Sequence, residues 1–435
     1  MASLKGRLSR LRDLGLVKAS MLGDSDKPAG GLADGLADGP AGLPASGLKT
    51  EPATGLTDRP AFLKGWDALA PHVWTRVVET PLRAPGTVRP STWLHLPDDP
   101  ELRSPEAFSF FDFETTGLSG GAGTLPFLAA IGAFAGSGFF VTQVLIDDYP
   151  GETTFLEYLL AELGGRKAVV TYNGSSFDMP LLRSRCIMNG IPSAEPIHLD
   201  ALHPARRLWK RSLSSCSLKV IESEILGLDR GEDIPGSAIP RVWLDFASGR
   251  GEGEMGLVCS HNASDITTLA RLFLRIDRIF AEPLNESALY RVDAPRLGLA
   301  LAAADRIPEA TALLEPLAAD GDPRSGFALC RIYRRQGMYD ERRRVAMAMP
   351  DIPEACVLKA KICEHSLRDY PAALEWTEKA LAGLSRRNGG GNDPGADSAT
   401  VMHASGALSE YRACTHESLE SRSSRLKRKI ALKGA

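Results

Sequence analysis

The sequence has no closely paired cysteines. Its seven cysteines are scattered and odd in number, and none of them forms a CxxC pair. A disulfide framework needs an even set and a zinc ribbon needs close pairs, so the pattern argues against both. Free thiols are typical of a reducing compartment, and we therefore predict a cytoplasmic protein.

Long hydrophobic runs are missing as well. No apolar stretch reaches the roughly 18 residues that a membrane-spanning helix needs, so we expect no stable membrane insertion. The charged N-terminus lacks the apolar core of a signal peptide, and we expect no export.

An excess of positive charge is also absent, because the formal net charge is −3. Any nucleic-acid-binding surface would therefore have to be local. The glycine-rich stretch 120–123 is not followed by a Lys-Ser/Thr pair, which excludes a phosphate-binding P-loop. Hydrophobic residues make up 43% of the chain and charged residues 24%, as is usual for a globular protein.

The N-terminal part of the chain has three sections. Residues 1–20 predict a short basic amphipathic helix. Residues 21–58 are rich in Gly, Ala, Pro and Asp, which predicts a disordered linker. Residues 59–105 form a tryptophan-containing segment that we expect to pack on the following domain. Its tryptophans are Trp66, Trp74 and Trp93.

Residues 106–285 alternate between patterns of strand and helix. Apolar and β-branched runs indicate strands at 108–115, 125–134, 138–146 and 168–173. Amphipathic stretches indicate helices at 154–164, 178–190 and 264–280. Strands first, then alternating helices and strands, predict an α/β fold with a mixed sheet flanked by helices.

Residues 294–385 predict an all-α region built from repeats. Ile307, Tyr339 and Tyr370 open similar motifs at spacings of 32 and 31 residues, and a helical stretch precedes each of them. A helix–turn–helix repeat near 34 residues is the tetratricopeptide pattern, and about three copies bury a continuous core. We expect a tetratricopeptide-like domain that binds a protein partner, followed by a linker and basic tail over 386–435.

Four carboxylates indicate the chemistry. Asp112 and Glu114 lie at i and i+2 on an expected strand, so both side chains face the same side. Asp178 follows a second strand, and Asp265 opens the last helix expected in this region. Buried carboxylates repel each other, and a divalent cation between them removes that penalty. Oxygen ligands suit Mg²⁺ or Mn²⁺, and two such ions support phosphodiester cleavage.

The same segments resemble known motifs. Residues 111–118 (FDFETTGL), 172–182 (YNGSSFDMPLL) and 261–272 (HNASDITTLARL) resemble the three exonuclease motifs of the DEDD superfamily. The intervening segments 198–209, 215–228 and 233–246 resemble the YprB-like ribonuclease H-like family. This resemblance implies a ribonuclease H-like fold with a catalytic two-metal site. Its implied metal ligands are Asp112, Glu114, Asp178 and Asp265.

A fifth residue departs from the superfamily pattern. One DEDD branch has a His five residues before the last Asp, and the other has a Tyr four residues before it, whereas His261 precedes Asp265 by four residues. With an ordinary pKa near 6.5, His261 would suit a catalytic role, orienting or deprotonating the attacking water. Alternatively, it caps or packs near the start of the helix.

Further candidates surround the carboxylates. Thr115 and Thr116 would offer backbone and hydroxyl donors to a terminal nucleotide, and Asn173 would bind a phosphate or serve only as a turn residue. Asp200 and His203 suggest a structural role beside the site. Four basic residues flank Trp209 and form either a nucleic-acid track or a solvated helix face. They are Arg206, Arg207, Lys210 and Arg211.

Together these features predict a two-metal-ion nuclease that hydrolyses phosphodiester bonds, with Mg²⁺ or Mn²⁺ as cofactor. The resemblance favours a 3′-5′ exonuclease acting on single-stranded DNA or RNA. The alternative is a catalytically weak nucleic-acid-binding scaffold that acts through its helical repeats. A third hypothesis is a helical-repeat adaptor held on a membrane surface by its basic termini.

Overall fold

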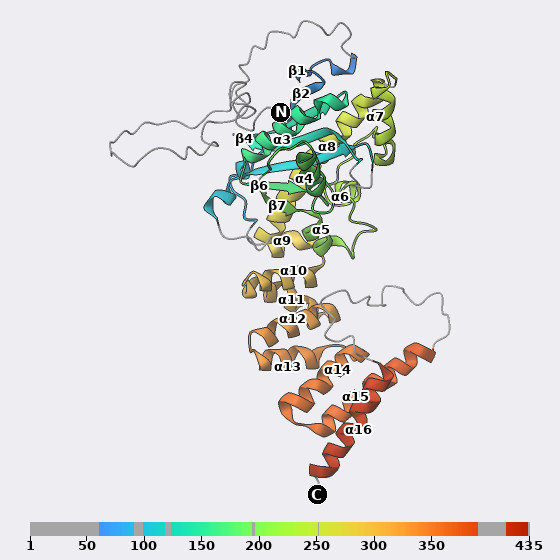
Figure 1. Ribbon diagram of the computed structural model, residues 1–435. Helices are drawn as coiled ribbons and strands as arrows, with labels where there is room; N and C mark the ends of the chain where they lie inside the picture. Colours follow the sequence, from blue (N-terminus) through green and yellow to red (C-terminus); the bar gives the residue numbers. More distant parts are fainter. Residues whose placement is uncertain are drawn as a thin grey trace, which may run out of the picture. The chain divides into compact units, whose positions relative to one another are not determined.

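The computed structural model describes residues 61–90, 99–117, 123–193, 196–250, 252–389 and 415–433 (Figure 1). The chain divides into two compact units. The first comprises Met1–Pro204 and Cys216–Arg275, and the second comprises Ala205–Ser215 and Ile276–Ala435. The predicted helix at 1–20, the predicted linker at 21–58 and Trp93 lie outside the described residues.

A mixed sheet of seven strands forms the centre of the first unit, in the order β1-β2-β5-β4-β3-β6-β7. Strands β3, β6 and β7 pair in parallel, and the other neighbours pair antiparallel. The predicted mixed sheet and the strands expected within it are confirmed. The strands are β1 (Asp67–Ala70), β2 (Val73–Thr80), β3 (Phe108–Thr115), β4 (Pro126–Ala135), β5 (Gly138–Ile146), β6 (Ala168–Thr171) and β7 (Ile197–Asp200).

The tryptophan-containing segment supplies two strands that the sequence did not predict. Strand β2 pairs with β5 from Val73 to Thr80, and β1 pairs with β2. Trp66 and Trp74 are buried in the core of the first unit. The charged residues within β2 dilute its apolar pattern, which explains why it escaped detection.

The helices of the first unit cover the sheet (Figure 1). They are α3 (Glu152–Gly164), α4 (Asp178–Met188), α6 (Leu218–Glu224), α7 (Ile239–Ala247) and the greater part of α8 (Glu252–Ala281). Helix α8 begins at Glu252 and not at 264 as predicted, so Asp265 lies inside the helix and does not open it. Two glycines lower the helix propensity of the first turns, but buried side chains at helical spacing override it. These are Met255, Val258, Cys259 and Asn262.

Strand β3 is packed on both faces. Phe108 and Phe110 lie against Phe273 of α8, with ring centroids 4.9 and 5.5 Å apart. Phe113, on the opposite face, stacks on Phe155 of α3 at 6.3 Å. Because side chains alternate along a strand, Asp112 and Glu114 continue the face of Phe108 and Phe110. The acidic pair therefore lies on the face that α8 covers.

Gly132 in β4 allows α8 to approach the sheet closely. A Cβ added at Gly132 would lie 2.4 Å from Cγ2 of Ile266 and 2.4 Å from Cζ of Phe139. Overpacking of this kind costs about 1–3 kcal/mol.

We expect Gly132→Ala to lower the melting temperature and to shift α8, which carries Asp265, away from the sheet. Gly253→Ala, in an open position on the same helix, should leave both unchanged or slightly raise stability. A Gly132→Ala protein with unaltered stability would contradict the close packing.

The second unit is helical, as the sequence predicts (Figure 1). Ile307, Tyr339 and Tyr370 each open the second helix of a pair. The residue two positions earlier has a positive φ in every pair: Asp305, Gly337 and Arg368, at 60°, 71° and 53°. The same turn thus recurs at the predicted spacing. The helices are α9 (Pro283–Leu289), α10 (Ala294–Ala303), α11 (Ile307–Ala319), α12 (Pro323–Arg335), α13 (Tyr339–Ala348), α14 (Pro353–Ile362), α15 (Tyr370–Gly389) and α16 (His416–Lys433).

The predicted linker and tail need correction. Helix α15 continues to Gly389, so residues 386–389 do not belong to a linker. The basic end of the chain is a docked helix, α16, in which Leu419 and Leu426 are buried. Three of its cations converge on Glu364, a side chain with 1% of its surface exposed. Arg422, Arg425 and Lys429 donate to the Glu364 carboxylate over 2.7, 3.0 and 2.9 Å.

Glu364 makes the stability of this unit pH-dependent. Burial acts to raise the pKa of Glu364, but hydrogen bonds from Lys429 and Arg425 outweigh it and hold the pKa below the usual 4.5. A carboxyl with a depressed pKa stabilises the fold above its unfolded pKa and loses that contribution as the pH falls. We expect Glu364→Gln to destabilise the unit at neutral pH by about 3–5 kcal/mol, since three cations lose their partner. The difference from wild type should shrink below about pH 4.5; a difference that persists there, measured by chemical denaturation, would contradict this account.

The basic track predicted around Trp209 depends on whether this side chain is exposed. Trp209 in α5 (Leu202–Trp209) is fully buried and donates to the carbonyl of Tyr290 over 2.7 Å. It has no exposed face for a base, so the predicted basic track lacks its aromatic group.

Within the described residues, no helix is both long and apolar enough to cross a membrane.

Candidate metal centre

The four predicted carboxylates converge in the first unit. Asp112 and Glu114 come from the C-terminal half of β3, Asp178 from the first residue of α4, and Asp265 from the middle of α8. Asp178 is 4% exposed, and one of its oxygens accepts the backbone N–H of Phe113 over 3.3 Å. This hydrogen bond links the start of α4 to β3, since Phe113 stands between Asp112 and Glu114 in the chain.

Electrostatic repulsion is strong in this cluster. Burial, followed by the charges of Asp178, Glu114 and Asp265, raises the pKa of Asp112 well above its usual range. Burial and the charges of Asp265 and Asp178 do the same to the pKa of Glu114. Burial also raises the pKa of Asp178 to about 7. The fold therefore holds carboxylates together at a cost that a bound cation would offset.

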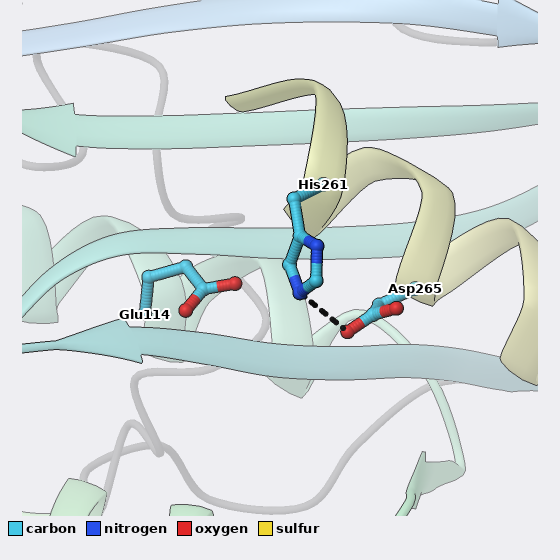
Figure 2. A group of neighbouring side chains, drawn as sticks. All are labelled: Glu114, His261 and Asp265. Carbon is cyan, nitrogen blue, oxygen red and sulfur yellow. Dashed lines mark ion pairs between the residues drawn. The ribbon is translucent and has the colours of Figure 1, made fainter. Parts of the chain in front are cut away.

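His261 lies between two of these carboxylates. Figure 2 shows its imidazole, on α8, beside Glu114 from β3 and Asp265 one helical turn further on. One ligand atom from each of the three lies within 4.8 Å of the others. The Nε2 atom of His261 is 3.5 Å from an Asp265 oxygen. His261 is inside α8, so it does not cap the start of the helix, and the capping alternative is wrong.

The other imidazole nitrogen of His261 is held by Asp233. Nδ1 lies 2.6 Å from Oδ1 of Asp233, which is nearly buried. Burial acts to raise the pKa of Asp233, but the hydrogen bond from His261 and the nearby cations lower it below its usual value. An ionised Asp233 can only accept, so the proton of a neutral imidazole lies on Nδ1 and the lone pair of Nε2 faces the carboxylates.

Sequence reasoning missed Asp233 and its neighbour Arg230. Arg230 donates to both Asp265 and Glu222, and Thr268 donates to the other oxygen of Glu222 over 2.9 Å. Both missed residues lie in the segment 229–238 between α6 and α7, which contains the family-like DIPGS sequence. That sequence was the available signal, although nothing in it indicates which side chains reach the site.

The predicted substrate-binding residues lie near the carboxylates in the chain, at the end of β3 and after β6. The Thr115 hydroxyl donates to the carbonyl of Gly117 over 2.7 Å, and the Thr116 hydroxyl accepts the N–H of Leu125 over 2.9 Å. Both threonines thus make local hydrogen bonds at the end of β3. Asn173 has a positive φ of 67°, and its N–H donates to Asp200 over 2.8 Å. Contact of these residues with a nucleotide stays a prediction.

Asp200 organises the loop before Asp178. Besides Asn173, its carboxylate accepts the N–H groups of Ser175 and Leu202 over 3.1 and 3.0 Å. Burial acts to raise the pKa of Asp200, but these hydrogen bonds and one from the Ser175 hydroxyl lower it. A carboxylate satisfied in this way has a structural task, which is the role that the sequence suggested for it.

The donor set fits a hard divalent cation. It consists mainly of carboxylate oxygens, and neighbouring protein groups neutralise only part of its charge. Mg²⁺ and Mn²⁺ prefer such oxygen ligands, and the imidazole of His261 would be accepted more readily by Mn²⁺ than by Mg²⁺. Asp112, Glu114, Asp178 and Asp265 are the residues that could hold such an ion.

Comparison with known proteins places this fold in a family. A model of the RNase_H superfamily matches residues 109–276. The protein YprB of Bacillus subtilis (strain 168) is 30% identical over 287 residues, which cover 63% of this chain and 68% of YprB. A family B DNA polymerase from the archaeon Pyrobaculum calidifontis is similar at 16% identity and a TM-score of 0.33. The match covers 55% of this chain and 34% of the polymerase, so the chain spans about a third of that protein. The relationship to YprB, together with the superfamily domain, shows that this chain belongs to the YprB-like family of ribonuclease H-like proteins.

Proposed function

We propose that the protein is a metal-dependent nuclease that hydrolyses phosphodiester bonds at the carboxylate cluster. The observation that supports this most strongly is the meeting of Asp112, Glu114, Asp178 and Asp265 at one place, with the pKa of three of them raised. A fold gains nothing in stability by burying these groups together. Such a cluster is instead typical of a site that binds cations and polarises a substrate.

Each residue would have a distinct task. Divalent ions bound by the four carboxylates would neutralise the scissile phosphate and lower the pKa of a water molecule. His261 would accept a proton from that water at Nε2. Asp233 would hold the imidazole by Nδ1, in the tautomer that leaves Nε2 free to accept. Thr115, Thr116 and Asn173 border the carboxylates and would contact the nucleotide that is cleaved.

The proposal is tested by incubating the full chain with labelled single-stranded DNA and RNA in Mg²⁺, Mn²⁺ or EDTA. We expect shortened products with metal and none with EDTA. A folded, metal-treated protein that leaves both substrates intact would contradict the proposal.

The position of the label tests the finer proposal of a 3′-5′ exonuclease. With a 5′ label, such an enzyme yields a ladder of successively shorter strands. With a 3′ label, it releases labelled mononucleotides at the earliest times. Immediate release of the label from the 5′ end would reverse the polarity, and a few long internal fragments would indicate an endonuclease.

A catalytically weak scaffold that acts through the helical repeats is the competing proposal. The observation in its favour is Arg230, whose guanidinium already pairs with Asp265 and so competes with a metal ion there. In that case the protein would bind single strands with equal affinity in EDTA and in Mn²⁺. Strand binding that requires Mn²⁺ would count against the scaffold.

A further inference from the structure

The strand register places four side chains in one row across the sheet. Arg76 of β2 lies opposite Gln143 of β5, Gln143 opposite Ala130 of β4, and Ala130 opposite Asp112 of β3. Directly opposed residues project from the same face of a sheet, so all four point toward α8. The row joins the strand β2, which the sequence did not predict, to the first carboxylate of the site.

Hydrogen bonds run along this row. Nε of Arg76 donates to Oε1 of Gln143 over 2.7 Å, and Nε2 of Gln143 donates to Oδ1 of Asn262 over 3.0 Å. Nδ2 of Asn262 then donates to Oδ2 of Asp112 over 3.2 Å. Gln143 and Asn262 have no exposed surface. Ala130 is also fully buried, and its methyl group cannot form a hydrogen bond between Gln143 and Asp112. Asn262 of α8 takes this place and connects the two side chains.

The direction of every bond in the row is fixed by its two ends. A guanidinium can only donate, so Gln143 must turn its oxygen toward Arg76. The carbonyl of Cys259 can only accept, and it takes the Gln143 amide N–H over 2.8 Å. Gln143 therefore presents N–H to Asn262, which must turn its oxygen to Gln143 and its NH₂ to Asp112. A flipped amide at either position would set two acceptors or two donors against each other.

We propose that Arg76, Gln143 and Asn262 form a positioning relay that fixes the orientation of the Asp112 carboxylate for metal binding. The inference rests on the proposed nuclease function and names positioning residues for that same site. One oxygen of Asp112 is occupied by Asn262, so the carboxylate cannot rotate freely and its other oxygen keeps one direction. Buried partners that orient a ligand in this way typically change metal affinity 10–100-fold when they are removed.

Two substitutions test the relay by separating donors from packing. Gln143→Glu keeps the shape and the acceptor for Arg76 but has no N–H for Asn262 or for Cys259. Asn262→Leu keeps the volume but removes the donor to Asp112. Thr142→Val is the matched control, because Thr142 neighbours Gln143 on β5 and lies on the opposite face of the sheet. The measurements are the Mn²⁺ dissociation constant of the full chain, by calorimetry, and the melting temperature in EDTA.

We expect both substitutions to raise the Mn²⁺ dissociation constant about 10- to 100-fold, and Thr142→Val to leave it unchanged. If Asn262→Leu fails to fold, Gln143→Glu still decides, because it adds no volume. Wild-type Mn²⁺ affinity in folded variants, with only the melting temperature lowered, would overturn the relay and leave the nuclease proposal intact. A wild-type protein that binds no Mn²⁺ would overturn both.

Discussion

Asp112→Asn should abolish metal-dependent cleavage and at the same time stabilise the metal-free protein. Loss of one ligand carboxylate removes several kcal/mol of transition-state stabilisation, and about 1.4 kcal/mol corresponds to a tenfold change in rate. We therefore expect a loss of about 10³-fold or more. Stability should move in the other direction, because burial and three neighbouring carboxylates disfavour a charge at Asp112. The uncharged amide removes that repulsion and can still accept from Asn262.

The two opposite effects are measured on the same protein. Cleavage rates are compared in saturating Mn²⁺, and melting temperatures are compared in EDTA. Asp245→Asn is the control, because Asp245 in α7 is a partly exposed carboxylate that pairs with Arg241 and Arg250. It should change neither quantity appreciably. If Asp112→Asn lowered the melting temperature in EDTA and left cleavage unchanged, Asp112 would be a structural residue.

Removal of the Asp233 carboxylate should slow cleavage nearly as much as removal of His261. Asp233→Asn can donate to Nδ1 and so favours the tautomer whose Nε2 carries the proton, which prevents Nε2 from accepting one. Loss of the orienting carboxylate in a comparable dyad costs about 10⁴-fold, and general-base catalysis is worth about 10²–10⁴-fold. We expect reductions in that range for Asp233→Asn and for His261→Ala. The double variant should be little worse than His261→Ala alone, because the two residues act as a unit.

The same variants distinguish a proton acceptor from a metal ligand. If His261 accepts a proton, His261→Ala lowers kcat while the Mn²⁺ dissociation constant stays near that of the wild type. If His261 binds the ion, the dissociation constant rises and excess Mn²⁺ partly restores the rate. Glu232→Gln serves as the control, since Glu232 is the exposed neighbour of Asp233 in the chain. Full activity of Asp233→Asn would exclude the dyad from the reaction.

Local pattern was sufficient to predict most of the central sheet and the helical repeats. Four of the eight residues of β3 are phenylalanines, and the recurrence of Ile307, Tyr339 and Tyr370 follows the helix pairs. Prediction failed where packing outweighs propensity. Helix α8 includes Gly253 and Gly256 because buried side chains at helical spacing hold this part of it on the sheet. Strand β2 forms despite the charged Arg76 because it pairs with β5.

The candidate site was predictable only as far as its four carboxylates. Carboxylates at fixed spacing on expected elements identify Asp112, Glu114, Asp178 and Asp265. The partners that hold the site depend on contacts between segments far apart in the chain. Asp233 reaches His261 across 28 residues, and Asn262 reaches Asp112 across 150. The sequence does not indicate which of these side chains meet, since their contacts depend on where α8 lies on the sheet.

The central claim is that the four carboxylates form a divalent-metal centre, and calorimetric titration of the metal-free full chain with Mn²⁺ tests it most directly. We predict saturable binding in the wild type, accompanied by a higher melting temperature, because a ligand that binds only the folded state stabilises it. Both effects should be lost or greatly weakened in Asp112→Asn. Failure of the folded wild type to bind Mn²⁺, or binding that is equal in Asp112→Asn, would contradict the claim.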